Sequence, residues 1–152
     1  MRRQEIDVRV HTAATPATVY ALLRAGASWP TWSPVDSYES ETPVDGDPDA
    51  AGAIRVFRTK RWSGTVVNRE QVLELVPNER VSYTTLSGLP IRDYRADITL
   101  TPDTNGTAIH WHSTFYPKLP GTGGMLKRTL GTFIETTARG LAAHAARNTP
   151  TP

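Results

Sequence analysis

The stretch TGGMLKRTLGTFIETTARGLAAHAAR, from Thr122 to Arg147, decides the fold of this chain. At roughly 100° per residue, Glu135 and Arg139 fall on its polar face, spaced for an i,i+4 ion pair. A helix of about 26 residues is roughly 39 Å long, so its apolar stripe needs a large partner. The residues of that stripe are Leu126, Leu130, Phe133, Ile134, Thr137, Leu141 and Ala145. The stretch therefore predicts a long amphipathic helix that packs against a sheet.

The residues before this helix supply the strands. Ile6, Val8 and Val10 alternate with polar neighbours, which predicts an opening strand buried on one face. Thr15-Pro16 gives an N-cap hydroxyl and a proline at the first helical position, which predicts a short helix. Short connectors with turn chemistry favour antiparallel pairing of the later strands. These strands are predicted over residues 38–41, 53–61, 65–76, 80–86, 91–101 and 107–116. The order of elements predicts an α+β fold in which the sheet curls around the final helix.

Length and composition limit the classes of protein. The 152 residues suit one domain, predicted over residues 1–147 with a disordered tail at 148–152. The net charge of +2 without a dense basic cluster argues against nucleic-acid binding. The absence of cysteine excludes disulfides and thiolate-bound metals. The N-terminus has no apolar run, so no signal peptide or membrane span is predicted. A cytoplasmic protein without a cofactor is the resulting expectation, while its oligomeric state stays open.

The histidines do not predict a metal site. His110 and His112 share a strand face and could in principle converge on a metal ion. Their alternation with apolar neighbours places both toward solvent, and His11 is placed in the same way on the first strand. His144 lies at the edge of the final helix's apolar stripe, where a partly buried structural histidine is expected.

Several segments together resemble a known family. They are Trp29-Pro-Thr-Trp-Ser-Pro34, Pro77-Asn-Glu-Arg-Val-Ser-Tyr83, Ser87-Gly-Leu-Pro-Ile-Arg-Asp-Tyr94, Gly106-Thr107 followed by Ile109, Trp111 and Phe115, and Gly121-Thr-Gly-Gly124. Over about residues 4–145 the chain resembles the START-like, SRPBCC superfamily, and within it the polyketide cyclase/dehydrase-like branch. The resemblance implies a helix-grip fold, in which a seven-stranded antiparallel sheet wraps a C-terminal helix and encloses an apolar cavity. Members bind lipids, sterols, polyketides and other hydrophobic molecules, and some catalyse cyclisation or dehydration. The branch has no catalytic signature to transfer to this sequence.

Aromatic residues supply candidates for the wall of such a cavity. Trp29 and Trp32, in a segment that also carries Pro30 and Pro34, predict a turn pinned to the core by its rings. They either cap the cavity entrance or pack without a ligand. Trp111 and Phe115 point inward from the last strand. Together with Leu130, Phe133, Ile134 and Thr137 of the final helix, these residues form the predicted apolar wall.

Polar residues placed toward the core supply candidates for orienting a ligand, because burying a polar group is costly unless it is bonded. The alternation predicts that Arg92 and Tyr94 point inward from one strand. Arg69 points inward from another strand, unless a bulge reverses the register of that strand. Tyr83 is a further candidate. The alternative is that the arginines lie at the surface and the tyrosine hydroxyls reach solvent. Thr137 either donates back to a helix carbonyl or lines the cavity.

Three hypotheses about function follow. The first is a binding protein for a hydrophobic lipid, polyketide-like or aromatic molecule held between the sheet and the final helix. The second is an enzyme for cyclisation or dehydration, with Tyr94, Tyr83, Arg92 or His144 as the acid or base; an inward Asp or Glu would favour it. The third is a protein–protein interaction module with a vestigial pocket.

Overall fold

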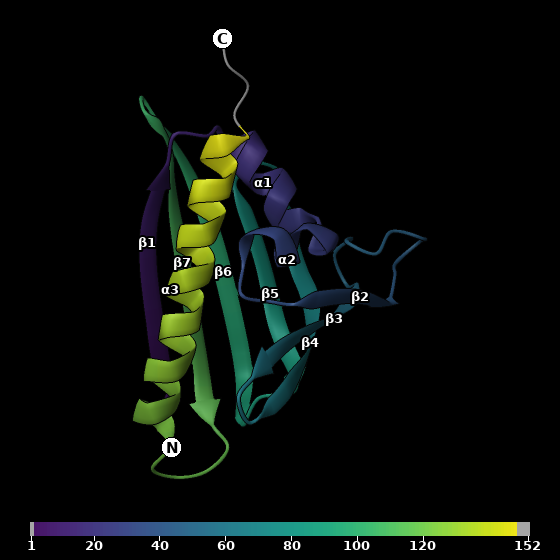
Figure 1. Cartoon of the computed structure of the whole chain (residues 1–152), viewed down its shortest axis with the longest axis vertical. Helices are drawn as coiled ribbons and strands as arrows, with labels where there is room; N and C mark the ends of the chain where they lie inside the picture. Colours follow the sequence, from purple (N-terminus) through teal and green to yellow (C-terminus); the bar gives the residue numbers. More distant parts are fainter. Residues whose placement is uncertain (1, 149–152) are drawn as a thin grey trace.

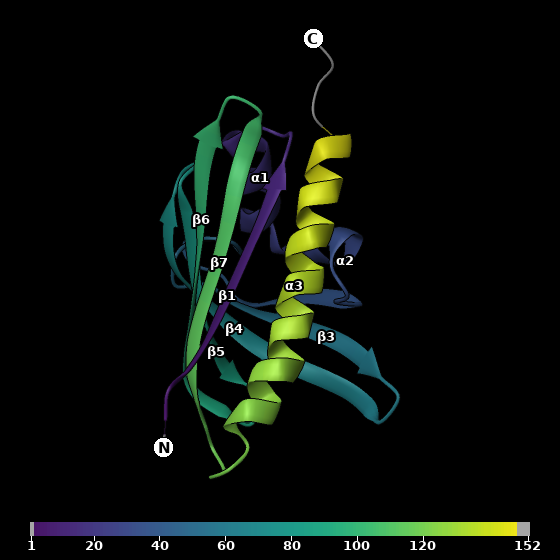
Figure 2. The ribbon, with the colours of Figure 1, turned by 90° about the vertical axis from the view of Figure 1, so that its left-hand side faces the viewer.

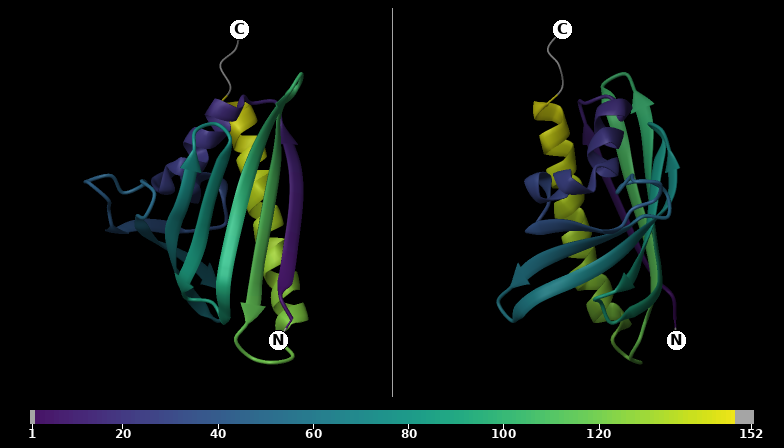
Figure 3. Two further views of the ribbon diagram at one scale, coloured as in Figure 1. Left: turned by 180° about the vertical axis from the view of Figure 1, so that it is seen from behind. Right: turned by 90° about the vertical axis from the view of Figure 1, so that its right-hand side faces the viewer.

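The computed structural model describes residues 2–148. Within them, seven antiparallel strands form one sheet in the order β1-β7-β6-β5-β4-β3-β2. The strands are β1 (Gln4–Thr12), β2 (Ser37–Thr42), β3 (Ile54–Arg61), β4 (Gly64–Val76), β5 (Arg80–Ser87), β6 (Ile91–Asp103) and β7 (Gly106–Pro117). The helices are α1 (Pro16–Arg24), the short 3-10 turn η1 (Gly26–Ser28), α2 (Trp29–Trp32) and α3 (Gly123–Arg147). They lie on one face of the sheet, whereas the other face carries no helix (Figures 1 and 3). The predicted α+β helix-grip fold is confirmed.

Helix α3 runs along the sheet and packs against β1 and β7 (Figure 2). In its second half the stripe residues Leu141 and Ala145 are fully buried, as predicted. Leu130 and Phe133 in its first half are only partly buried. The predicted ion pair forms on the opposite face, where Arg139 Nη2 lies 2.9 Å from Glu135 Oε1. The C-terminal half of α3 therefore completes the core, whereas apolar side chains of its N-terminal half are left partly uncovered.

The segment between β1 and β2 forms short helices. Thr15 caps α1, since its hydroxyl accepts from the Thr18 amide at 3.3 Å. The expected irregular turn at Trp29–Trp32 is instead a short α-helix, α2. It tolerates Pro30 because a proline in the first helical turn loses no hydrogen bond. Both tryptophan rings are buried, with centroids 4.8 Å apart, so the rings do pin this segment to the core.

Helix α3 approaches α2 very closely at one glycine. A Cβ atom on Gly140 would lie 2.0 Å from the carbonyl oxygen of Trp32. Only glycine permits this approach, which fixes where α2 sits along α3.

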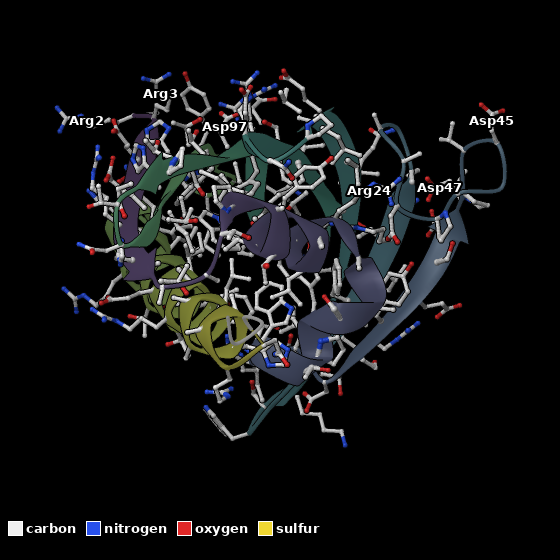
Figure 4. All side chains as sticks on the ribbon, turned by 90° about the horizontal axis from the view of Figure 1, so that it is seen from above. Arg2, Arg3, Arg24, Asp45, Asp47 and Asp97 are labelled. Carbon is white, nitrogen blue, oxygen red and sulfur yellow. The ribbon has the colours of Figure 1, made fainter. Side chains whose placement is uncertain are left out.

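The long connection between β2 and β3 is held to α1. Arg24 Nη2 donates to Asp47 Oδ2 at 2.6 Å, and the two side chains meet in the view from above (Figure 4). Asp45 marks the outer end of this connection (Figure 4) and adopts a φ of 50°, beside Gly46 at 78°.

Two further expectations concern the ends and the environment of the chain. The predicted tail lies almost entirely outside the described residues; only Asn148 belongs to them, and its amide caps α3 by donating to the His144 and Ala145 carbonyls. No helix in the described part of the chain is long and apolar enough to cross a membrane.

Candidate functional site

A cavity of about 350 Å³ lies between the first half of α3 and the inner face of strands β3 to β7. Its volume falls in the range of small-molecule sites, and its wall is mostly apolar with a few polar groups, as in such sites. Eight of the residues predicted from the sequence line it: Trp29, Tyr83, Tyr94, Trp111, Leu130, Phe133, Ile134 and Thr137. The partly buried side chains of α3 are thus explained, because Leu130 and Phe133 face the cavity rather than the sheet.

Aromatic rings build the inner wall. The Trp29 ring lies 5.2 Å from Phe57, 5.9 Å from Trp111 and 6.2 Å from Tyr83, measured between centroids. The contacts with Trp111 and Tyr83 are edge-to-face, a favoured arrangement of aromatic pairs. These rings come from α2, β3, β5 and β7, so the wall exists only in the folded chain.

Trp32 and Phe115 do not line the cavity. Trp32 packs behind Trp29, and its indole nitrogen donates to the Ser28 hydroxyl at 3.0 Å. Phe115 is fully buried in the core. Trp32 supports the wall through its contact with Trp29, and neither residue is placed to touch a ligand.

The predicted inward position of Arg92 is wrong. A bulge interrupts the pairing of β6 with β7 between Arg92 and Arg95, and Asp93 within it has a φ of 54°. The extra residue turns Ile91 and Tyr94 inward and leaves Arg92 exposed. The Arg92 guanidinium carbon lies 5.3 Å from the centroid of the Tyr116 ring, outside the cavity.

The predicted inward position of Arg69 is also wrong, for a similar reason. A bulge in β4 between Val72 and Glu74 puts Leu73 on the outer face, so counting backward from Leu75 assigns the wrong face to Arg69. Arg69 instead forms a two-bond ion pair with Glu41, with nitrogen–oxygen distances of 2.7 and 2.6 Å.

Glu70, and not Arg69, points inward from this part of β4. It lines the cavity and is 6 % exposed. Its Oε2 accepts from Asn68 Nδ2 at 2.6 Å, while its Oε1 is buried without a hydrogen-bond partner in the described chain. Burial raises the pKa of this carboxyl to about 7, although Arg55 and Asn68 oppose the shift. The cavity therefore holds a carboxyl group that can bind or release a proton near neutral pH.

Arg55 lies directly across the β3–β4 ladder from Glu70 and is 1 % exposed. Its guanidinium carbon lies 5.3 Å from the Phe57 centroid and 5.7 Å from the Trp29 centroid. Its Nη1 donates to the Arg24 carbonyl at 3.1 Å and lies 3.6 Å from Asp49 Oδ1, whereas Nε and Nη2 are buried without hydrogen-bond partners among residues 2–148. Neither Arg55 nor Glu70 was expected in the site from the sequence. A signal existed, since Val66, Asn68, Glu70 and Val72 alternate, but Leu73 and Leu75 gave an equally good alternation in the other phase.

The two cavity tyrosines are linked to each other and to a serine. The Tyr94 hydroxyl lies 3.0 Å from the Ser113 hydroxyl and 3.5 Å from the Tyr83 hydroxyl. Burial raises the pKa of Tyr94 to about 12 and that of Tyr83 well above its usual value. Both tyrosines stay neutral at physiological pH and are available as hydrogen-bond donors or acceptors.

Thr137 satisfies both alternatives raised by its sequence position. It lines the cavity, and its hydroxyl donates to the Phe133 carbonyl at 2.7 Å. The hydroxyl proton is therefore held by the helix, and the side chain presents mainly its methyl group to the cavity.

The cavity reaches solvent at one end. Arg61, Trp62 and Ser63 at the β3–β4 hairpin are lining residues, and Trp62 is fully exposed. The turn at Leu89 and Pro90 and the first turns of α3 complete this rim. We refer to this rim, formed by residues 61–63, Leu89 and Pro90, and Leu126 and Thr129, as the mouth.

The histidines lie away from the cavity. His110 Nε2 is 2.9 Å from Asp7 Oδ2, and His112 Nε2 is 3.0 Å from Glu5 Oε1, on the outer face of the sheet. Glu5, Asp7 and His112 bring their ligand atoms within 4.8 Å of one another and are a group that could hold a metal ion. Cross-strand pairs of opposite charge are common on exposed sheet faces, so these contacts have an ordinary structural explanation. His144 lies in the second half of α3 and is not among the lining residues.

Comparison with known proteins places this arrangement in a family. The family model described as polyketide cyclase / dehydrase and lipid transport matches residues 3–146. The chain belongs to this family. The START-like resemblance found in the sequence is thereby confirmed. A search of curated proteins gave no match.

Solved structures of this family's fold are similar over most of the chain. A START superfamily protein from Mycobacterium smegmatis is 16% identical with a TM-score of 0.80, over 95% of this chain and 99% of that chain. The di-domain ARO/CYC StfQ from the steffimycin biosynthetic pathway is 17% identical with a TM-score of 0.79, over 95% of this chain and 51% of StfQ. A protein from Thermobifida fusca is 24% identical with a TM-score of 0.76, over 97% of both chains. At these identities the likeness establishes the fold.

Proposed function

We propose that this family member binds a small hydrophobic molecule, aromatic or polyketide-like, in the cavity between α3 and the sheet. The observation that carries the proposal is an aromatic-walled cavity of about 350 Å³ that reaches solvent at a fully exposed tryptophan. Burial of apolar ligand surface against Trp29, Phe57 and Trp111 supplies the driving force. The family description and the biosynthetic origin of StfQ agree with such a ligand class. A cavity of this size fits poorly with an interaction module whose pocket is vestigial.

The test is thermal unfolding with a panel of fused-ring aromatics, flavonoids, sterols and fatty acids. A ligand present at about 100 times its Kd adds about 2.7 kcal/mol to the free energy of unfolding, which raises the Tm by about 5–10 °C. Leu130→Trp fills the cavity from α3 and should abolish the shift. Leu86→Trp is the matched control, because Leu86 is exposed and lies outside the lining. A panel without a shift would contradict the proposal, as would an equal shift for Leu130→Trp.

A second candidate function, an enzyme that moves a proton on its ligand, is favoured by one observation. Glu70 places an unpartnered carboxylate oxygen in the cavity, with a pKa of about 7 that suits a general base at neutral pH. Glu70 would take the proton from a carbon next to a ligand carbonyl. The electron pair would move into the new carbon–carbon double bond, leaving an enolate oxygen that the neutral hydroxyl of Tyr83 or Tyr94 can stabilise.

Proton exchange distinguishes the enzyme from a simple carrier. Wild-type protein should speed the loss of the α-proton NMR signal of a bicyclic ketone, such as 1-tetralone, in D2O. Glu70→Gln keeps the size of the side chain but removes the base, so exchange should fall to the uncatalysed rate while the ketone still binds. Equal exchange with and without wild-type protein would leave binding as the function.

A further inference from the structure

Two buried polar atoms on the cavity wall have no hydrogen-bond partner in the described chain. Both are acceptors on β4, Asn68 Oδ1 and Glu70 Oε1. Both residues line the cavity. Buried polar groups in folded proteins are nearly always bonded, and an unpaired one is costly. Two such acceptors from neighbouring inward positions of β4 indicate a surface shaped for a polar group of a bound molecule.

The two acceptors are held in fixed positions by each other. Asn68 and Glu70 are two residues apart on β4 and therefore point to the same face of the sheet. The Asn68 amide nitrogen is used in its 2.6 Å bond to Glu70 Oε2. This bond leaves the amide oxygen of one residue and the second carboxyl oxygen of the other available. The pair presents two neighbouring acceptors inside a mostly apolar space.

We propose that Asn68 and Glu70 form a subsite that receives a hydroxyl group of an otherwise apolar aromatic ligand. The inference rests on the proposed binding function and adds the chemical group that the cavity selects. The hydroxyl proton is donated to Glu70 or Asn68, and the ring carbons pack against the aromatic wall.

The charges around the subsite favour a neutral hydroxyl over an ammonium group. Arg55 lies opposite Glu70 on β3, and its guanidinium packs against Trp29 and Phe57. Its positive charge already acts on the Glu70 carboxyl, although Asp49 Oδ1 lies 3.6 Å from Arg55 Nη1. A ligand cation at Glu70 would have to share this carboxyl with the Arg55 charge and be repelled by it. The other titratable groups near Glu70, Tyr83 and Tyr94, are neutral and add no charge to attract one.

A pair of probes that differ in one group tests the subsite. Isothermal titration calorimetry at pH 7 compares 2-naphthol with 2-methylnaphthalene, whose methyl group takes the place of the hydroxyl. One hydrogen bond to an otherwise unpaired buried group is expected to make 2-naphthol bind about tenfold more tightly. A protonated amine, 2-(aminomethyl)naphthalene, should bind more weakly than 2-naphthol.

Variants locate the preference. Asn68→Leu combined with Glu70→Leu removes both acceptors, so the two neutral probes should bind with nearly equal affinity. Arg69→Leu is the matched control, because Arg69 lies between Asn68 and Glu70 in sequence but on the outer face of the sheet, where it pairs with Glu41. This variant should still bind 2-naphthol about tenfold more tightly than 2-methylnaphthalene.

The outcomes separate this inference from the proposed function. Equal affinity of wild-type protein for both neutral probes overturns the subsite and leaves the binding function intact. Tighter binding of the amine overturns the choice of a hydroxyl, and a preference that survives in the double variant places the recognition elsewhere. Binding of none of the naphthalenes overturns the subsite, whereas the proposed function falls only if the wider panel also fails. The wild-type comparison decides the matter even if the double variant does not fold.

Discussion

The carboxyl of Glu70 couples the chemistry of the cavity to the stability of the fold. Burial raises its pKa from the usual 4.5 to about 7 in the folded protein. Between these values the folded protein keeps a proton that the unfolded chain has released. The free energy of unfolding therefore falls as pH rises through this window. Burying Glu70 therefore costs more free energy when its carboxyl is ionised than when it is protonated.

A pH series of urea unfolding measures this cost. From pH 4 to pH 8, wild-type protein should lose about 3 kcal/mol relative to Glu70→Gln, which has no proton to release. The loss should be complete by about pH 8, where the folded carboxyl is ionised. Parallel curves for the two proteins would show that Glu70 is solvated rather than buried.

Residue positions in the site were predictable only where strands are regular. Tyr94 was assigned correctly to the cavity, since the alternation of β6 is unbroken after it. Arg92 and Arg69 were assigned wrongly because a bulge shifts the phase at Asp93 and at Leu73. A bulge depends on how the whole sheet curves and leaves little trace in composition. For the same reason Glu70 could not be recognised before the register of β4 was known.

At the scale of elements, the close contact between α2 and α3 depends on Gly140, which has no side chain. Gly140→Ala would place a methyl group 2.0 Å from the Trp32 carbonyl oxygen. We expect the free energy of unfolding to fall by about 1–2 kcal/mol, because overpacking outweighs the better helix propensity of alanine.

Gly131 in the same helix provides the control. A Cβ atom there would meet only Ile6 Cγ2 at an ordinary 3.9 Å. Gly131→Ala should therefore raise the free energy of unfolding by about 0.5–1 kcal/mol. Both values come from urea unfolding, and equal effects of the two substitutions would mean that α2 does not press on α3 in solution.

The elements themselves followed from the sequence because their signals are local. The 3.6-residue period of α3 and the Thr15-Pro16 cap of α1 each act within a few residues. Helix α2 was missed, since a four-residue helix has no period to detect and its prolines suggested a turn. Its helical form depends on the two tryptophan rings finding the core, which is a tertiary effect.

At the scale of the whole molecule, the sheet is not uniformly packed. Strands β6 and β7 carry alternating fully buried residues, whereas β2 at the far edge is almost entirely exposed. Helix α3 covers β1 and β7, and the cavity lies over the strands toward β3. The two ends of the sheet should therefore open with different free energies.

Hydrogen exchange followed by NMR or mass spectrometry tests this difference. Amides of β6 and β7 should exchange only through global unfolding, while those of β2 exchange faster through local opening. A bound ligand should slow exchange most in β3, β4 and β5, whose side chains line the cavity. Uniform protection across the sheet would contradict this picture.

The cavity has a consequence for how long the protein survives. Side chains such as Leu130 and Phe133 face a cavity that opens to solvent, so in the free protein they make fewer packing contacts than residues of a closed core. A ligand that binds only the folded chain supplies the missing contacts, and each tenfold rise in its concentration above Kd lowers the unfolded fraction about tenfold. Proteases that cleave the unfolded chain would then degrade the protein more slowly as the ligand accumulates. The lifetime of the protein in the cell would then increase with the supply of its ligand.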